Sequence, residues 1–233
     1  MDVLENKVTE IKCLDHGYVQ LCDCYPRLVP AGRDCEVAIV QAARVSYQQG
    51  LKDPVTDEKL VKYLIRNNHT SPLEAVQFTF RIYCPLFVAV HLLRHRTAKL
   101  NMQSQRYSQI REDVCYSALN TPGGIRSPDA VNKQGSAPIS VVSAEMEALL
   151  KEAEATQQHL FELYSKLITV GLAKEVARGF LTTNQYTQMI FTMDLNNLRR
   201  FCALRCDSHA QWETQVYANA IKSLVQPLVP NCI

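Results

Sequence analysis

"AVQFTFRIYCPLFVAVHLLRHR", residues 75–96, decides the fold, because it joins a predicted strand to a predicted helix without a linker. Apolar residues occupy every second position from Val76 to Ile82, which is typical of a strand with one buried face. Pro85 then suits the first turn of a helix that carries "LFVAVHLLRHR". The stretch therefore predicts a strand that leads, through one helix, into a cluster of basic side chains.

Hydrophobic periodicity and turn residues place further elements on both sides of this stretch. Residues 120–142 are rich in Gly, Pro, Ser and Asn and predict a long flexible loop. Helices outweigh strands, so the predicted class is α+β. The predicted strands cover residues 7–14, 18–26, 76–82 and 185–193, and the predicted helices cover residues 35–47, 57–67, 86–96, 143–170, 173–181, 195–205 and 208–225.

The composition excludes several classes of protein. A chain of 233 residues can bury a sizeable core, and 47% hydrophobic and 21% charged residues are ordinary for a soluble globular protein. A formal net charge of +2 gives no global case for nucleic acid or membranes. No apolar run approaches the roughly 18 residues that span a bilayer. The N-terminus resembles neither a signal nor a transit peptide. We therefore expect a soluble, cytoplasmic protein.

The nine cysteines and six histidines do not form an obvious metal motif. An odd number of cysteines without a CxxC pair favours reduced thiols. Cys202 and Cys206 lie one helical turn apart, as do His209 and Glu213, but neither pair has the further ligands that tetrahedral zinc needs. We interpret the two cysteines as packing residues and His209 as a capping and packing residue. Asp207 or Ser208 is expected to cap the last helix.

The basic cluster is the strongest candidate for a binding site. Arg94 and Arg96 would diverge by about 200° on a regular helix, so they reach one ligand together most easily if the helix ends there. Arginine gives bidentate recognition of phosphate or carboxylate, and Ser104 with Arg106 adds further donors. A solvated helix end is the alternative for the two arginines alone. "HTSPLE", residues 69–74, fits a turn or helix cap as well as a site, and Arg178 alone predicts a surface ion pair with Glu175.

Taken together, these segments resemble the flavin-dependent thymidylate synthases. The signature of that family is Arg-His-Arg, seven residues and then Ser, and this chain has Arg94, His95, Arg96 and then Ser104. Asn101, Arg106 and Tyr107 are in register with the elaborated form of the signature. The likeness extends, in the order of the family, to "AARVSY" at 42–47, "HTSPLE" at 69–74, "KEVAR" at 174–178 and "LRCDSHAQWE" at 204–213.

The resemblance implies a single domain over residues 1–233, with an antiparallel or mixed sheet flanked by helices that include one long helix. It also implies a homotetramer with active sites shared between subunits. The implied reaction converts dUMP to dTMP, with methylenetetrahydrofolate as the carbon donor and NADPH as the reductant of bound FAD. No nucleic-acid partner, membrane or metal is implied.

The resemblance also implies roles for individual residues. Arg205 is the implied catalytic residue, placed against the uracil ring to favour its electron-rich form. Ser104 has no adjacent general base, so it is assigned to binding rather than to nucleophilic attack. The implied dUMP-binding residues are His91, Arg94, Gln103, Ser104, Gln105, Arg106, Arg178 and Arg205. The implied FAD-binding residues are Ser71, Glu74, Arg94, His95, Arg96, Asn101, Met102, Asn196 and Arg200.

The chain departs from the pattern of the family at a few positions. Met102 stands where Glu is usual, and His91 stands where Gln is common. Asn196 and Arg200 replace an Asn-x-Arg arrangement, and Asp194 beside them is interpreted as a helix cap. These departures leave open an alternative: a flavin- or nucleotide-binding member that modifies another pyrimidine nucleotide or has a regulatory role. A nucleic-acid-binding module that uses the Arg-His-Arg patch is a third hypothesis; near-neutral charge and few interleaved aromatics count against it.

Overall fold

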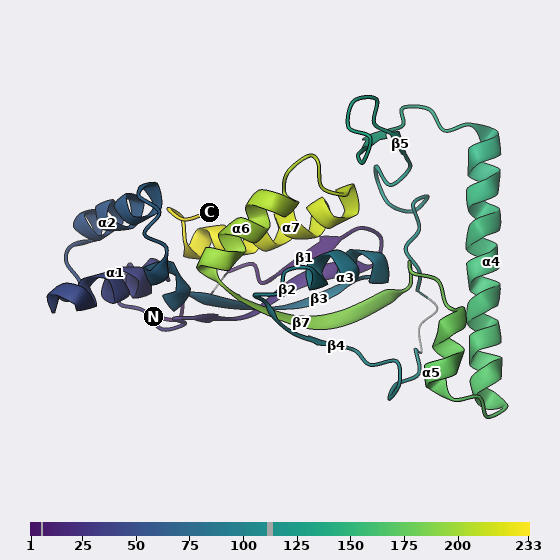
Figure 1. The fold of residues 1–233 in the computed structure, drawn as a ribbon, viewed down its shortest axis with the longest axis horizontal. Coiled ribbons are helices and arrows are strands. Elements are labelled where there is room, and N and C mark those ends of the chain that lie inside the picture. Colours follow the sequence, from purple (N-terminus) through teal and green to yellow (C-terminus); the bar gives the residue numbers. More distant parts are fainter. Residues whose placement is uncertain (6, 111–113) are drawn as a thin grey trace.

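The computed structural model describes residues 1–5, 7–110 and 114–233, and its centre is a five-stranded sheet (Figure 1). All four neighbouring strand pairs are antiparallel, so the α+β prediction is confirmed and the sheet is antiparallel rather than mixed. In spatial order the strands are β1 (Glu10–Cys13), β2 (Gly17–Tyr25), β3 (Gln77–Pro85), β7 (Tyr186–Asp194) and β4 (Lys99–Met102).

Strand β3 lies in the middle of the sheet and carries the alternation that the sequence predicts. Phe78, Phe80 and Ile82 have no exposed surface and belong to the main hydrophobic core. The strand pairs with β7 along its whole length, from Gln77 opposite Asp194 to Pro85 opposite Tyr186. Because successive side chains of a strand point to opposite faces, the buried side chains of β3 all lie on one face of the sheet, and this face packs in the core.

Helices cover that face of the sheet. The helix α3 (Leu86–Leu93) follows β3 directly, α6 (Leu195–Arg205) follows β7, and α7 (Trp212–Val225) packs beside α6 (Figure 1). Two further helices, α1 (Glu36–Arg44) and α2 (Pro54–Arg66), lie together at one end of the molecule. None of the described helices is long and apolar enough to cross a membrane.

The long helix α4 (Ala144–Thr169) stands apart from this body (Figure 1). Its start is the one predicted, because the Ser143 hydroxyl accepts a hydrogen bond from the Met146 amide at 3.1 Å. Its end is also the one predicted, at Gly171, whose φ of 100° favours glycine. The short helix α5 (Lys174–Ala177) packs against α4 around a second, small core of Ile110, Tyr164 and Ala177.

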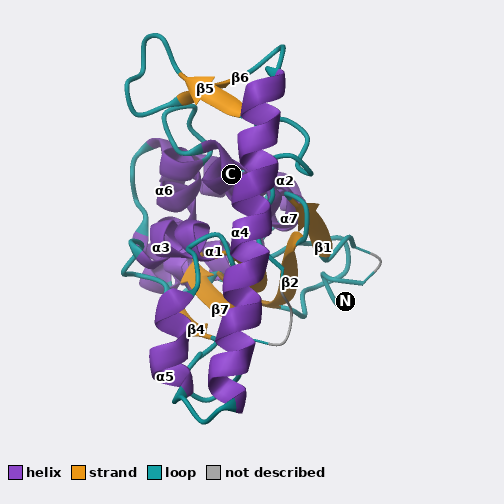
Figure 2. Ribbon diagram, turned by 90° about the vertical axis from the view of Figure 1, so that its right-hand side faces the viewer, coloured by secondary structure: helices purple, strands orange, loops and turns teal. Residues whose placement is uncertain are grey.

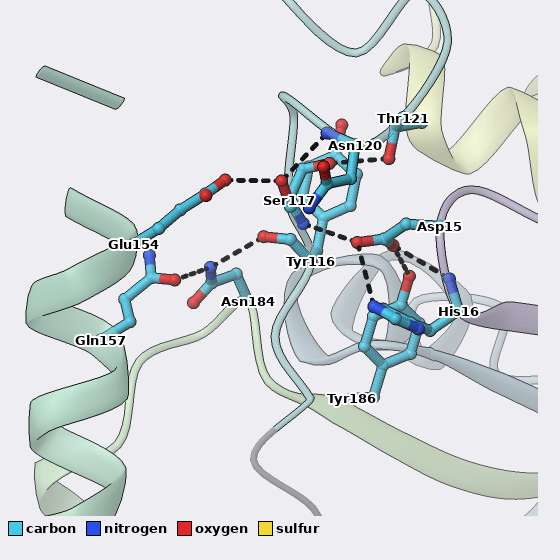
Figure 3. A network of polar contacts seen from close by, with 10 residues as sticks. All are labelled: Asp15, His16, Tyr116, Ser117, Asn120, Thr121, Glu154, Gln157, Asn184 and Tyr186. Carbon is cyan, nitrogen blue, oxygen red and sulfur yellow. Dashed lines mark hydrogen bonds and ion pairs between the residues drawn. The ribbon is translucent and has the colours of Figure 1, made fainter. Parts of the chain in front are cut away.

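A polar network joins α4 to the sheet (Figure 3). Its centre is Asp15, in the turn between β1 and β2, which accepts hydrogen bonds from the Tyr186 hydroxyl and from the Ser117 amide at 2.8 Å. The Ser117 hydroxyl donates to Glu154 of α4 at 2.5 Å, and the Asn184 amide donates to Gln157 of the same helix at 2.8 Å. The segment around residue 117 therefore connects the long helix to the body of the molecule.

The structure differs from the sequence prediction in several places. The helices predicted over residues 86–96 and 173–181 are shorter, since α3 ends at Leu93 and α5 at Ala177. Strand β4 is not predicted, and the predicted long loop of residues 120–142 contains a hairpin of β5 (Arg126–Pro128) and β6 (Ser136–Pro138) near one end of α4 (Figure 2). These strands have three or four residues, too few for an alternating pattern to be detected. The last helix begins at Trp212 rather than residue 208, with no side-chain cap, so the prediction of an Asp207 or Ser208 cap is wrong.

Candidate active site

The Arg-His-Arg segment begins where α3 ends, at Leu93. The α-helical hydrogen bonds give way here to tighter ones, from the His95 amide to the Leu92 oxygen at 3.1 Å and from the Arg96 amide to the Arg94 oxygen at 3.1 Å, so the regular helix does not continue to Arg96. Both side chains belong to exposed residues. Within the described residues, neither guanidinium forms an ion pair with a carboxylate. Two positive charges are thus left available to an anion.

Arg205 lies at the C-terminal end of α6 and reaches back to this segment. Its Nε donates to Nε2 of His95 at 2.9 Å, and its Nη2 donates to the backbone oxygen of His91 at 3.4 Å. Burial and the nearby Arg94 lower the pKa of Arg205, although a guanidinium stays protonated in proteins. The fold therefore brings the predicted catalytic arginine to two predicted binding residues more than 100 positions away in the sequence.

His91 and His95 both lie on the inner side of this arrangement. The Nδ1 atom of His91 is 2.8 Å from the hydroxyl of Thr214, which is fully buried in α7. The ring of His95 meets Phe201 edge-on, with centroids 4.8 Å apart. Burial, followed by the charge of Arg205, lowers the pKa of both imidazoles, so both are neutral at pH 7.

A second set of predicted FAD-binding residues meets at the start of α6. The Asn196 side chain, 5% exposed, donates to the Glu74 carboxylate at 3.3 Å. Ser71 lies in the same short 3-10 helix as Glu74, and Arg200 is exposed one turn along α6. Asp194 accepts a hydrogen bond from the Asn197 amide at 3.0 Å, which confirms its interpretation as a helix cap.

The predicted phosphate-binding residues follow β4. The Ser104 hydroxyl accepts a hydrogen bond from the Arg106 amide at 3.3 Å, which forms a tight turn. Arg106 donates from Nε to Glu175 at 2.8 Å, so the predicted ion pair of Arg178 with Glu175 is wrong. The side chain of Arg106 reaches Glu175 from another part of the chain, a contact that sequence spacing does not reveal. Arg178 is left exposed.

Two cavities are lined by the end of β4 and the segment that follows it. The larger, about 900 Å³, includes Asn101, Met102 and Gln103, and the smaller, about 300 Å³, includes Met102, Gln103, Gln105 and Arg178. Arg205, His91, Arg94 and His95 line neither of these two cavities. One chain thus gathers the predicted residues into three groups: one at the ends of α3 and α6, a second between β4 and Arg178, and a third where Glu74 meets Asn196 at the start of α6.

Several polar residues that line these cavities were not predicted, among them Lys174 and Gln185. Lys174 lines the larger cavity and donates to the backbone oxygen of Tyr107 at 3.1 Å. Gln185, 5% exposed, lines the smaller cavity, and its Oε1 has no hydrogen-bond partner among the described residues. Lys174 opens the "KEVAR" segment, from which only Arg178 was assigned a role, whereas Gln185 stands in no motif that the sequence analysis named. Only their position after a turn or at a strand end could have suggested them.

No cluster of three or more metal-ligating side chains occurs among residues 1–5, 7–110 and 114–233. All nine cysteines are free; Cys202 is buried and Cys206 half-buried, as expected for packing residues. His209 pairs with Asp207 at 2.6 Å but is 78% exposed at its side chain, so the expected packing role is wrong. The turn projects into solvent because α7 begins only at Trp212.

Comparison with known proteins decides the family. The model of a family described as thymidylate synthase complementing protein matches residues 27–231. The chain belongs to this family. The resemblance to flavin-dependent thymidylate synthases is thereby confirmed, and with it, at the level of the family, the prediction of a flavin-dependent methyltransferase.

Relatives in this family are similar along almost the whole chain. The flavin-dependent thymidylate synthase of Dictyostelium discoideum is 38% identical over 221 residues, covering 95% of this chain and 71% of the relative. An enzyme of the same name from Thermus thermophilus is 41% identical over 220 residues, covering 94% of this chain and 75% of the relative.

A solved structure has the same fold. The UMP/dUMP methylase PolB from Streptomyces cacaoi, bound with 5-Br dUMP, superposes with a TM-score of 0.79 at 26% identity. The similarity covers 95% of both chains. The predicted sheet with flanking helices and one long helix is therefore an architecture that this chain shares with a solved UMP/dUMP methylase.

Proposed function

We propose that this chain converts dUMP to dTMP, with methylenetetrahydrofolate as the carbon donor and NADPH as the reductant of bound FAD. The observation that carries the proposal is the position of Arg205, which the two histidine residues hold beside Arg94 without any carboxylate partner among the described residues. A cation of this kind, half-buried and uncompensated, can stabilise negative charge that develops on a uracil ring.

The donor groups of the site fit FAD. The pyrophosphate of FAD needs permanent cations, and Arg94 and Arg96 present two guanidinium groups that no described carboxylate neutralises. Asn196 and Glu74, which bond to each other at 3.3 Å, offer a donor and an acceptor to the rest of the cofactor, with Ser71, His95, Asn101, Met102 and Arg200 as further candidates. When bound, the flavin supplies the hydride that the methylene group requires.

The nucleotide site is proposed on the second group of residues. Ser104, Arg106 and Arg178 would hold the phosphate of dUMP, with Gln103 and Gln105 beside them in the smaller cavity. A charge-assisted hydrogen bond to a phosphate contributes about 1.5–3 kcal/mol. Arg106 would exchange its contact with Glu175 for the phosphate, because that ion pair is largely exposed and costs little to break.

The separation of the group around Arg205 from the group around Arg178 supports a homotetramer with shared sites. Arg178 follows α5, which lies beside α4 and away from α6 (Figure 1), whereas Arg205 lies at the end of α6. A second copy of the chain could supply the phosphate-binding residues to the site that Arg205 occupies.

The nine free cysteines support a reducing compartment, and we propose that the protein is cytoplasmic.

The proposal is tested on the purified protein by absorbance spectroscopy and product analysis. We expect a flavin spectrum after incubation with FAD. NADPH should then be oxidised and dTMP should appear when dUMP and methylenetetrahydrofolate are present together. A protein that takes up no FAD, or that oxidises NADPH but yields no dTMP, would contradict the proposal.

A second candidate is methylation of another pyrimidine nucleotide, since the superposed PolB structure is that of a UMP/dUMP methylase. Met102, which replaces the usual Glu, lines both cavities and adds a reason to consider it. Parallel assays with dUMP and UMP decide between the two. Methylation of UMP at a rate similar to dUMP would favour the second candidate.

A further inference from the structure

Arg205 is fixed along one edge of its guanidinium group. Nε donates to His95, in the segment that follows α3, and Nη2 donates to the backbone oxygen of His91, in the last turn of α3. A guanidinium has five N–H donors in a rigid fork, so two fixed donors determine the direction of the remaining three. These two contacts therefore also set the direction of the edge that carries Nη1.

The contact with Arg205 determines the protonation of His95. An imidazolium has two N–H donors and no acceptor, whereas a neutral imidazole accepts at its unprotonated nitrogen. Because Nε2 accepts from Arg205, the proton of His95 must sit on Nδ1. Burial of the ring, followed by the charge of Arg205, which approaches it from α6, favours this neutral form. Phe201 packs edge-on against it and excludes water.

Histidine has an advantage over a carboxylate at this position. A carboxylate would also orient Arg205, but it would neutralise the charge that an anionic ligand needs. A neutral imidazole orients the guanidinium and leaves its full charge available. The ordering of a long, flexible side chain before the ligand arrives reduces the entropy lost on binding and in the transition state.

We propose that His95 is a positioning residue for Arg205, acting through the lone pair of its Nε2 atom, rather than chiefly a flavin ligand. The inference rests on the proposed role of Arg205, and it adds to the FAD-binding role that the family resemblance implies for His95. His91 is the second support, through its backbone oxygen. Its ring is held by the buried Thr214 at 2.8 Å, which keeps that part of α3 in place.

The sign of the pH dependence follows from the lowered pKa of His95. The pKa of a histidine is about 6.5 in the unfolded chain, and here the folded-state pKa is lower. The neutral ring therefore keeps its contact above about pH 6.5, and the contact is lost as the pH falls through the folded-state pKa. Protonation would remove the acceptor and set two cations against each other. Turnover should therefore fall on the acid side, as the pH drops below the unfolded-state pKa of about 6.5.

Two substitutions of His95 test the proposal. His95→Gln keeps an acceptor that does not titrate, and His95→Leu has a similar size without an acceptor. We expect His95→Gln to keep kcat within about threefold of the natural protein and to lose the acid limb of the pH profile. We expect His95→Leu to lower kcat on the order of 30-fold, with the flavin spectrum and the KM for dUMP little changed. His209→Gln, at an exposed histidine, is the control.

Three results would overturn the proposal: equal loss in His95→Gln and His95→Leu, loss of bound flavin in both, or full activity of His95→Leu. Nitrogen NMR of the natural protein gives a test that needs no variant and no turnover. It should report a neutral His95 with its proton on Nδ1, and a proton on Nε2 at neutral pH would refute the contact. If the natural protein forms no dTMP, the proposed function fails, but the NMR result still decides the inference.

Discussion

At the scale of single residues, the proposed chemistry depends on Arg205. It combines a permanent charge with partial burial and a fixed direction, and the groups that fix it are neutral. Serine and cysteine nucleophiles are not needed for this arrangement. The Ser104 hydroxyl accepts from a backbone amide and has no adjacent base among the described residues, which agrees with its assignment to binding.

Arg205→Ala should lower kcat by at least about 100-fold, because it removes the charge aimed at the developing anion. The flavin spectrum should remain, since Arg94 and Arg96 are intact. Arg205→Lys is the matched variant: it keeps a charge but cannot donate to His95 and His91 in one plane, so an intermediate rate is expected. A variant Arg205→Ala that loses flavin but turns over normally once saturated with FAD would refute the assigned role.

Gln185 is a residue whose side-chain oxygen is buried without a partner among the described residues. Gln185→Met should therefore raise the free energy of unfolding by about 1 kcal/mol and the melting temperature by about 2–4 °C. Gln188→Met, in the strand that follows, is the matched control, because the Gln188 amide donates to the Tyr18 hydroxyl at 2.8 Å and its loss should destabilise the protein. Equal destabilisation by both substitutions in thermal melts would show that Gln185 is satisfied in solution.

At the scale of elements, the junction between β3 and α3 was predictable. The contacts made by the residues at the end of α3 were not. Alternation from Val76 to Ile82 and the proline at 85 are local signals, and the structure has the strand and the helix in place. Strand β4 alternates over only four residues, too few to identify a strand, so its pairing with β7 defines it. The contact of Arg205 with His95 joins residues 110 positions apart, and periodicity carries no information about such a pair.

For the predicted site residues as well, the residue identities were predictable and their contacts were not. The family signature named His91, His95 and Arg205 without showing that they touch. Arg106 was expected near phosphate, but its contact with Glu175 depends on how α5 packs beside α4. Residue types and spacing can be read from the sequence, whereas partners depend on tertiary packing.

The network around Asp15 attaches α4 to the sheet, and Asp15→Ala tests its contribution. The substitution leaves the Tyr186 hydroxyl and the Ser117 amide without an acceptor, in a region where the Asp15 side chain is 4% exposed. We expect a loss of about 3 kcal/mol and a melting temperature lower by roughly 6–12 °C. Asp23→Ala, at a side chain that is 57% exposed, should change stability by less than about 0.5 kcal/mol. Similar thermal melts for the two variants would contradict the role of the network.

At the scale of the whole molecule, the surface of α4 points to other copies of the chain. Tyr164 is the one buried residue among the 26 of this helix. Leu149 is 59% exposed, and Met146 and Leu163 are 39% and 38% exposed. A helix that stands apart from its own body with apolar residues on its surface favours an interface between subunits.

Light scattering should therefore give a mass of about four times the 26.4 kDa of one chain. Leu149→Glu should dissociate the assembly and abolish turnover, because a charge in an apolar interface is costly. Val55→Glu is matched to it, since Val55 of α2 is also 59% exposed, and it should leave the mass unchanged. A natural protein that is fully active as a monomer would rule out shared sites.

The identity of the folate product tests the central claim most directly. If NADPH, through FAD, supplies the reducing equivalents, the folate gives up only its one-carbon group. Chromatography of the reaction mixture should then show dTMP and tetrahydrofolate in equal amounts, with NADPH consumed in the same amount as dTMP is formed. Formation of dihydrofolate, or the absence of dTMP from a protein that binds both FAD and dUMP, would contradict the account.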